Sequence, residues 1–108
     1  MNSDISRGKR IDNGEWIEGE LKRQGSKWTI NSILVNPNFV HYFTKRSDKN
    51  GKMIFSGHIV RYCGKDYEII FDEPNFFMGN NGFDLFCGTK FKVNEMEIVD
   101  NIYNDPKF

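Results

Sequence analysis

The absence of alanine is the feature that most constrains how this 108-residue chain can fold. Leucine, another strong helix former, occurs three times, at Leu21, Leu34 and Leu85. Aromatic residues make up 15% of the chain. Together with Ile, Val and Thr, they are the residue types that pack well on a pleated, half-buried surface. The composition therefore predicts an all-β protein whose core is rich in aromatic side chains.

Short extended segments alternate with turn residues along the chain. Residues 16–21 alternate in side-chain direction, and residues 27–35 resume after Gly25, so we predict an N-terminal antiparallel hairpin over residues 15–35. Residues 36–38 (NPN) are predicted to break the chain, because proline cannot donate to a sheet ladder. Asn50 and Gly51 favour a second tight turn. Further strands are predicted at residues 39–44, 53–55, 57–63, 67–71, 83–92 and 96–103, which together indicate a small barrel or roll of short antiparallel strands.

The chain has the length of a single domain, so we assign residues 1–108 to one folding unit. Residues 1–10 carry few apolar side chains and are expected to form a loosely ordered leader. Residues 72–82 contain Pro74 and the run MGNNG, and they are predicted to form an irregular loop. We therefore expect ordered strands between these two segments and again after the loop.

Cysteine usage and hydropathy indicate the compartment. Cys63 and Cys87 are far apart in sequence, and residues 1–10 lack the apolar core of a secretory leader. No apolar run approaches the roughly 20 residues needed to span a bilayer. We therefore expect a reduced cytoplasmic protein that is not anchored in a membrane.

Charge is distributed unevenly although the net charge is zero. Residues 22–65 contain nine basic side chains and one acidic one, whereas residues 66–108 contain three basic and nine acidic ones. A basic middle can form a surface for nucleic acid or for an acidic partner. The two halves can equally lie side by side and neutralise each other, and the sequence leaves both readings open.

Several segments of the chain, taken in order, resemble one known family. The opening segment is residues 7–19, RGKRIDNGEWIEG. The central segments are Phe43 with Thr44, residues 48–52 (DKNGK) and residues 54–62 (IFSGHIVRY), and the ending is residues 102–106, IYNDP. In this order they resemble the YopX protein family, and the resemblance extends over nearly the whole chain.

The resemblance implies a small SH3-type β-barrel and a protein encoded by phages or prophages of low-GC Gram-positive bacteria, acting in the cytoplasm of the bacterial host. The resemblance implies no particular biochemical activity. The chain departs from the family pattern where relatives tend to have an acidic pair around the central glycine, because it has Ser56 and His58 there. It also has Lys45 and Arg46 where relatives tend to have a glycine after the threonine.

The residues that could support catalysis or metal binding do not form a recognisable pattern. A zinc site would require His41 and His58 together with both cysteines, and no close pair of these residues supports it. A Cys–His nucleophilic site lacks a defining motif, and the acidic residues are placed as expected for turns and solvent-facing positions. Residues 79–82 lack the Lys-Ser/Thr sequel of a phosphate-binding loop. We therefore predict no enzyme activity, no metal, no cofactor and no small-molecule substrate.

Basic residues interleaved with aromatic ones form the first candidate binding site. Such a surface would contact phosphates through its cations and stack bases on its rings, or it would contact an acidic partner. Dedicated nucleic-acid-binding proteins are usually strongly basic, so the zero net charge of this chain argues against nucleic acid as the partner. The candidate residues are Lys22, Arg23, Lys27, Lys45, Arg46, Lys49, Lys52, Arg61 and Lys65, with Tyr42 and Tyr62.

A protein-contact loop is the second candidate. Phe76, Phe77 and Met78 lie in the predicted loop over residues 72–82, and exposed aromatic and methionine side chains often anchor protein interfaces. The alternative is that Phe76 and Phe77 close one end of the barrel. We therefore expect a small accessory protein that binds a host or viral macromolecule stoichiometrically, in regulation or counter-defence. A protein partner or self-association is favoured over nucleic acid, and a nucleic-acid-binding module using the basic face of residues 22–65 is the alternative.

Overall fold

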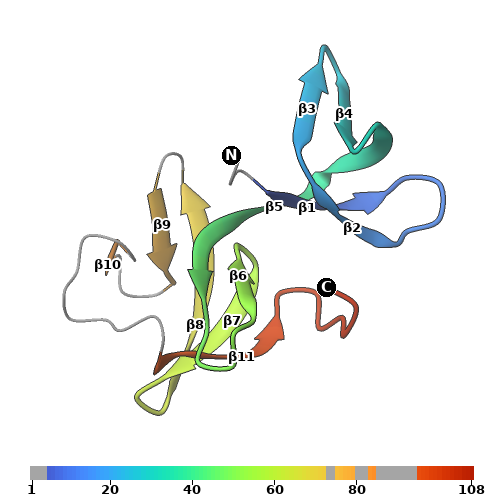
Figure 1. Ribbon diagram of the computed structural model, residues 1–108. Coiled ribbons are helices and arrows are strands. Elements are labelled where there is room, and N and C mark those ends of the chain that lie inside the picture. Colours follow the sequence, from blue (N-terminus) through green and yellow to red (C-terminus); the bar gives the residue numbers. More distant parts are fainter. Residues whose placement is uncertain (1–4, 73–74, 80–82, 85–94) are drawn as a thin grey trace.

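The computed structural model describes residues 5–72, 75–79, 83–84 and 95–108, and antiparallel strands form its framework (Figure 1). The all-β prediction is confirmed. The strands build a roll rather than a closed barrel, because they divide into two sheets. Within the described ranges there is no helix with the length and hydropathy needed to cross a membrane.

The first sheet has the strand order β2-β1-β5-β4-β3, with β6 paired to β5. Glu20 alone separates β2 from β3, so the two strands form one bent ribbon. The first half of this ribbon pairs with β1 and the second half pairs with β4, which curls the sheet into a roll. The strands are β1 (Ser6–Arg10), β2 (Trp16–Gly19), β3 (Leu21–Gln24), β4 (Lys27–Ile30), β5 (Ile33–Ser47) and β6 (Met53–Phe55).

The interior of this N-terminal roll is tightly packed. Ile30 and Val35 are fully or almost fully buried. Gly8 of β1 faces them, and a Cβ atom at this position would lie 2.9 Å from Ile30 Cδ1. That distance is too short for two carbon atoms in contact, so a residue without a side chain allows β1 to approach β4 and β5 closely.

The second sheet has the order β10-β9-β8-β7-β11. Its inner face supplies most of the main core, which includes Ile54 of β6. The strands are β7 (His58–Tyr62), β8 (Lys65–Asp72), β9 (Asn75–Met78), β10 (Phe83–Asp84) and β11 (Glu97–Asn101). The buried core residues are Ile54, Val60, Ile69, Phe76, Met78 and Met96.

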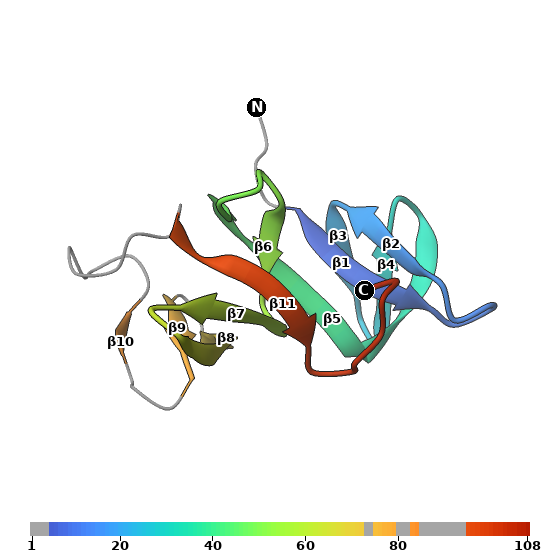
Figure 2. The same cartoon turned by 90° about the horizontal axis from the view of Figure 1, so that it is seen from below.

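Strand β5 connects the roll to the second sheet, as Figure 2 shows. Its first half pairs with β4 and β1, while farther along the ring of Tyr42 packs on the ring of Phe71 in β8, with centroids 4.5 Å apart. The predicted break at residues 36–38 is wrong, because β5 continues through them. The pairing of β5 with β1 shifts register here, and a bulge of this kind is where a strand tolerates proline.

Three further predictions on chain organisation can be compared with the strands. Residues 6–10 were expected in a loosely ordered leader, which is wrong, because they form β1 between β2 and β5. Residues 75–78 were expected in an irregular loop, which is also wrong, because they form β9 and pair with β8. The N-terminal hairpin exists as β3 and β4, closed at Gly25 with a φ of 63°, but residues 16–19 pair with β1 instead.

The segment after β11, residues 102–108, returns to the roll, and in Figure 2 the C-terminus lies beside β1 and β2. Asn101 organises its turn: the side-chain oxygen accepts the N–H groups of Tyr103 and Asp105, and Nδ2 donates to the Asp105 carbonyl at 2.7 Å. Trp16 Nε1 donates to the Asp105 carboxylate at 3.1 Å. The segment is thereby fixed between the two sheets, with Phe108 buried.

Candidate functional site

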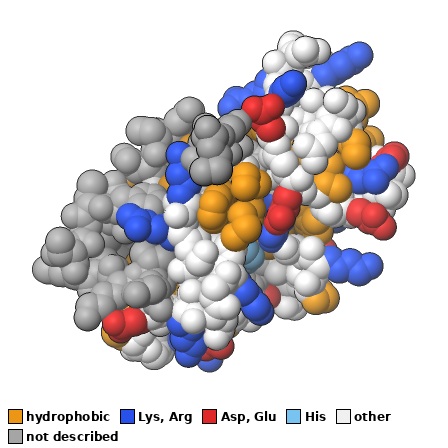
Figure 3. Space-filling model, viewed as in Figure 1, with side chains coloured by type: hydrophobic (Ala, Val, Ile, Leu, Met, Phe, Trp, Pro, Cys, Tyr) orange, Lys and Arg blue, Asp and Glu red, His pale blue; other side chains and the backbone are white. Residues whose placement is uncertain are grey.

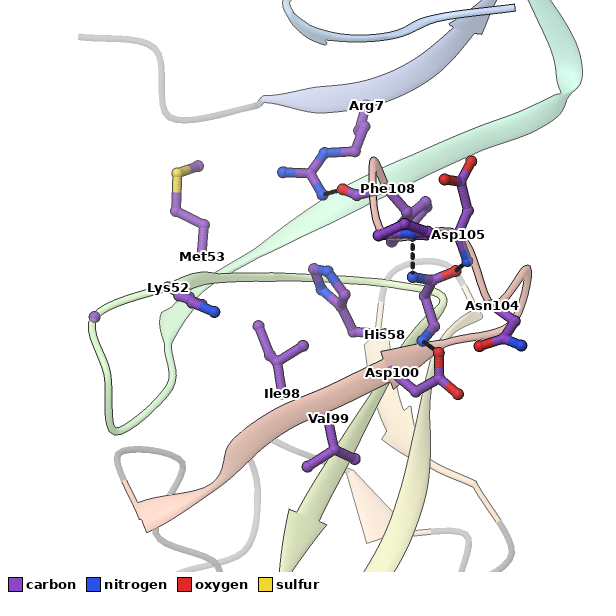
Figure 4. A pocket seen from close by; sticks show the side chains of 13 residues that line it. Arg7, Lys52, Met53, His58, Ile98, Val99, Asp100, Asn104, Asp105 and Phe108 are labelled. Atoms are coloured by element: carbon purple, nitrogen blue, oxygen red, sulfur yellow. Dashed lines mark hydrogen bonds between the residues drawn. The ribbon is translucent and has the colours of Figure 1, made fainter.

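An open groove of about 680 Å³ lies where the C-terminal segment faces β6 and β11 (Figure 4). Its walls come from five separate parts of the chain, which the two sheets and the C-terminal segment bring together. They are Arg7 of β1, residues 51–53, His58 of β7, residues 98–101, and the C-terminal positions 104–106 and 108.

The groove combines an apolar lining with a polar rim. Met53 lies at the left in Figure 4, Ile98 and Val99 lie in the lower part, and Val99 is 37% exposed. Lys52 and Asp100 also line it and are exposed. Figure 3 shows hydrophobic side chains gathered beside a histidine on this face of the molecule. An apolar centre with charged edges is the usual anatomy of a protein-binding surface.

Arg7 ties the groove to the roll and is itself fully engaged. Its side chain is 14% exposed, its Nη2 lies 2.5 Å from Glu18 Oε2, and its Nη1 donates to the main-chain oxygen of Phe108. The guanidinium carbon also lies 4.2 Å from the centroid of the Phe55 ring. Through these contacts Arg7 holds the C-terminal segment against β1 and β2.

His58 is buried at the back of the groove. Its Nδ1 accepts the N–H of Phe55 at 2.9 Å, which places the proton of the neutral ring on Nε2. The ring packs edge-on against Phe108, with centroids 4.9 Å apart. Burial, together with the nearby charge of Arg7, lowers the pKa of His58 from 6.5 to about 4. The ring is therefore neutral at physiological pH and acts as a structural acceptor.

His41 lies in a short chain of hydrogen bonds. Its Nδ1 is 3.2 Å from Ser56 Oγ, and its Nε2 is 2.6 Å from the Tyr103 hydroxyl. Burial, with Arg7 nearby, lowers the pKa of His41 to about 4, and burial raises the pKa of Tyr103. Ser56 Oγ also accepts the N–H of Tyr42 at 3.0 Å.

A serine beside a histidine is the arrangement of a nucleophile and its general base. A histidine with a pKa of about 4 is a weak base at neutral pH, where efficient general bases have pKa values closer to 7. Ser56 is also only 5% exposed, which restricts access for a substrate. The contacts of Ser56 and His41 therefore fit a role in joining β5, β6 and the C-terminal segment.

The central segment of the family resemblance is also structural. Asp48 is 4% exposed, and its carboxylate accepts N–H groups from Asn50 and Lys52, each at 2.9 Å, and from Ile98 at 3.0 Å. Burial alone would raise the pKa of Asp48, but these three hydrogen bonds outweigh it and lower the pKa. The side chain thus fixes the turn before β6 to β11 and sets one edge of the groove.

The structure separates the nine predicted basic residues into groups. Lys22, Arg23 and Lys27 lie on the β3–β4 hairpin, whereas the other six lie between the end of β5 and the β7–β8 turn. In Figure 1 the β3–β4 hairpin lies at the top of the molecule and the β7–β8 turn at its lower end. Residues 22–65 therefore do not gather their cations at one place on the surface.

Two of these cations lie beside carboxylates in the structure. Arg61 pairs with Asp66 at 2.8 Å, and Lys49 lies 3.5 Å from Glu97. The two predicted stacking rings, Tyr42 and Tyr62, pack against the main core. They are half-buried there and do not form an open platform for bases.

The predicted protein-contact residues occupy a strand. Phe76 and Met78 of β9 are buried in the main core, at 8% and 0% exposure, and Phe77 is half-buried. These three side chains are therefore not an exposed patch in this fold. The alternative prediction was that Phe76 and Phe77 close one end of the barrel. Phe76 is buried as this requires, but Phe77 is only half-buried and the strands form a roll, not a closed barrel.

Cys63 is exposed in the turn between β7 and β8, and Cys87 lies outside the described residues. Of the four side chains that a zinc site would require, His41, His58 and Cys63 are among the described residues. In the portion of the chain that the structure describes, no three side chains of His, Cys, Asp or Glu are grouped to hold a metal ion.

Sequence reasoning missed three residues that shape the groove: Arg7, Asn101 and Phe108. Arg7 was assigned to the leader, and it meets the Phe108 oxygen across 101 positions of sequence. The one available signal was an aromatic residue at position 108, after the polar run NDPK, which is unusual for a solvent-exposed segment. Nothing in the sequence marks Asn101 as the residue that organises the last turn.

Comparison with known families gives one assignment for the chain. The family model described as YopX protein matches residues 2–108. A comparison with curated proteins found no match.

Proposed function

The chain belongs to the YopX family, and from this premise and the geometry of the groove we propose that it is a non-catalytic accessory protein that binds a host or viral macromolecule stoichiometrically. The context that goes with this proposal is a phage or prophage gene product acting in the cytoplasm of the bacterial host. The role is regulation or counter-defence, and the favoured partner is a protein.

The use of the reactive side chains supports binding over catalysis. His41, His58 and Asp48 form hydrogen bonds with neighbouring groups of the protein, and both histidines have pKa values of about 4. Arg7 forms an ion pair with Glu18 and is hydrogen-bonded to the C-terminal segment. Groups held in this way stabilise a scaffold and are poorly placed to move protons for a substrate.

The groove is the observation that carries the proposal. It offers about 680 Å³ with Met53, Ile98 and Val99 in its lining and charged groups at its edge. A cleft of this size accommodates a few side chains of a protein partner, and methionine adapts its shape to different contacts. We therefore propose that a peptide segment of the partner enters the groove.

Matched variants test this proposal. We expect Val99→Asp to abolish binding, because it introduces an unpaired charge inside the groove, whereas Ile102→Asp should retain it. Ile102 is a matched control position, because its side chain is also exposed, at 45%, and lies outside the groove lining. The full chain and both variants would be expressed in a phage-carrying host, and any captured protein would be produced separately for calorimetric titration.

The expected outcome is a defined stoichiometry with the native chain and with Ile102→Asp, and no heat of binding with Val99→Asp. Equal binding by all three chains would exclude the groove. Turnover of a substrate by the purified chain, at a rate proportional to its concentration, would overturn the non-catalytic proposal.

Nucleic-acid binding is a second candidate, because Lys22, Arg23 and Lys27 are exposed on the β3–β4 hairpin and form no ion pair with any residue that the structure describes. That surface is distinct from the groove.

A further inference from the structure

The β3–β4 hairpin concentrates positive charge at one end of the molecule. Lys22, Arg23 and Lys27 are exposed and lie within one hairpin of two four-residue strands. The hairpin projects from the roll at the top of Figure 1, and Figure 3 shows Lys and Arg side chains at this end. Positive charge on a projecting element attracts polyanions over a distance of about a Debye length.

Among the described residues, Arg7, Arg10 and Arg61 each pair with a carboxylate, and the cations of the hairpin differ from them in this respect. In the described part of the chain, no carboxylate forms an ion pair with Lys22, Arg23 or Lys27. The sequence explains this, since it contains no Asp or Glu from Leu21 to Ser47, and the nearest acidic residues precede β3. The charge of the hairpin is therefore available to an external anion.

The strand register distributes the cations over both faces of the hairpin. Lys22 pairs with Thr29 and Gln24 with Lys27, so both lysines lie on one face. Arg23 pairs with Trp28 on the opposite face, and its guanidinium carbon lies 4.7 Å from the Trp28 ring centroid. The stacking on Trp28 holds the guanidinium in place while leaving its edge open to donate hydrogen bonds.

We propose that this hairpin binds double-stranded DNA by entering the major groove, with Lys22, Arg23 and Lys27 contacting phosphates on its two walls. The major groove of B-DNA is about 12 Å wide and admits a two-stranded ribbon. The major groove of double-stranded RNA is deep and narrow, so it does not admit such a ribbon between its walls. The binding depends on backbone contacts, so it is independent of base sequence.

The strength of binding follows from the number of cations. Three phosphate contacts give a slope of roughly −2.7 in a plot of log affinity against log salt concentration, and affinity should fall about 40-fold between 50 and 200 mM salt. Fluorescence anisotropy with a labelled 20-base-pair DNA duplex measures both quantities. A duplex RNA of the same sequence should bind at least tenfold more weakly.

Two variants of equal charge decide whether the hairpin is responsible. The first combines Lys22→Gln, Arg23→Gln and Lys27→Gln. The second combines Lys49→Gln, Lys65→Gln and Lys107→Gln, which removes three exposed cations from other elements. We expect the hairpin variant to lose DNA binding and the control variant to retain it within a factor of three, with circular dichroism and thermal melting confirming that both remain folded.

Several outcomes would overturn the proposal. They are no binding of DNA by the native chain at 25 mM salt, equal losses in the two variants, and equal binding of DNA and polyglutamate, which would assign the hairpin to an acidic protein instead. The groove proposal is tested separately, because Val99→Asp alters the groove and should still bind DNA as the native chain does.

Discussion

Mild acid should destabilise this protein through two buried histidines. Burial and the positive charge of Arg7 lower the pKa values of His41 and His58 from 6.5 to about 4. Between these two pH values the unfolded chain binds more protons than the folded one. The stabilisation from the neutral rings is therefore complete above pH 6.5 and is lost as the pH falls toward 4.

The magnitude follows from the two pKa shifts. Within this window each histidine changes the free energy of unfolding by up to about 1.4 kcal/mol per pH unit. At pH 5 the loss is roughly 2 kcal/mol for each ring relative to pH 8, or about 4 kcal/mol for both. A domain of this size is stable by about 5–15 kcal/mol, so the effect is a large fraction of the total.

Urea unfolding at pH 8, 7, 6 and 5 measures this loss. Trp16 provides the signal, since its ring packs edge-on against Phe108 with centroids 4.8 Å apart. Titration of Asp48 does not interfere, because its pKa is lowered from 3.8 and it acts at lower pH. His58→Asn keeps an acceptor for the N–H of Phe55 and removes one titrating group, so it should halve the pH dependence.

A difference in unfolding free energy below about 0.5 kcal/mol between pH 8 and pH 5 would refute this reasoning, because two neutral buried rings require a larger loss. An unchanged pH dependence in His58→Asn would assign the effect to other groups.

Three substitutions give further predictions, all measured by urea unfolding at pH 8. Arg7→Lys should lower the free energy of unfolding by about 2–3 kcal/mol, because an ammonium group cannot replace the planar guanidinium that bridges two partners. Asp48→Asn should lower it by about 2–3 kcal/mol, since one acceptor for three N–H groups is lost. The exposed control Asp66→Asn should have almost no effect. Equal losses of stability in Asp48→Asn and Asp66→Asn would show that the three N–H groups bound by Asp48 find other acceptors. Lys45→Gly should raise it by about 0.5–1 kcal/mol, because the φ of Lys45 is 65°, where glycine is favoured; a loss of stability would contradict this.

The strand content and several turns were predictable because their signals are local. Gly25, Gly51 and Gly64 all have positive φ values, 63°, 78° and 78°, in connections between consecutive strands. Glycine adopts this conformation without the steric penalty of a side chain, so turn positions are encoded by single residues. The absence of alanine and the abundance of aromatic residues both favour strands over helices along the whole chain.

Strand pairing was harder to predict, because it depends on contacts between distant segments. Residues 16–19 follow the same alternation as β3, and nothing within them indicates that they pair with β1 instead of β4. Phe76 and Phe77 were assigned to a loop because Pro74 and several glycines surround them. The alternation of buried Phe76, half-buried Phe77 and buried Met78 shows the period of a strand, but three residues are too few to establish it.

The groove was not predictable for the same reason, since five parts of the chain contribute to it. Its lining residues are ordinary when each is considered in its own segment. Arg7 becomes informative only beside Phe108, and Asp48 only beside β11. Sequence motifs identify sites whose residues are close in the chain, whereas this groove is created by the packing of two sheets and the C-terminal segment.

Ser56 and His58 contribute to the acid sensitivity expected of this chain, because they accept main-chain N–H groups without carrying a negative charge. Ser56 Oγ accepts the N–H of Tyr42, and His58 Nδ1 accepts the N–H of Phe55. A carboxylate accepts the same donors, so the fold requires an acceptor at each position and not a particular charge. With carboxylates there, Arg7 would face negative charge, and protonation would begin only near pH 4. With Ser56 and His58, Arg7 instead opposes protonation of the histidines, which moves the acid transition into the range between pH 4 and 6.5.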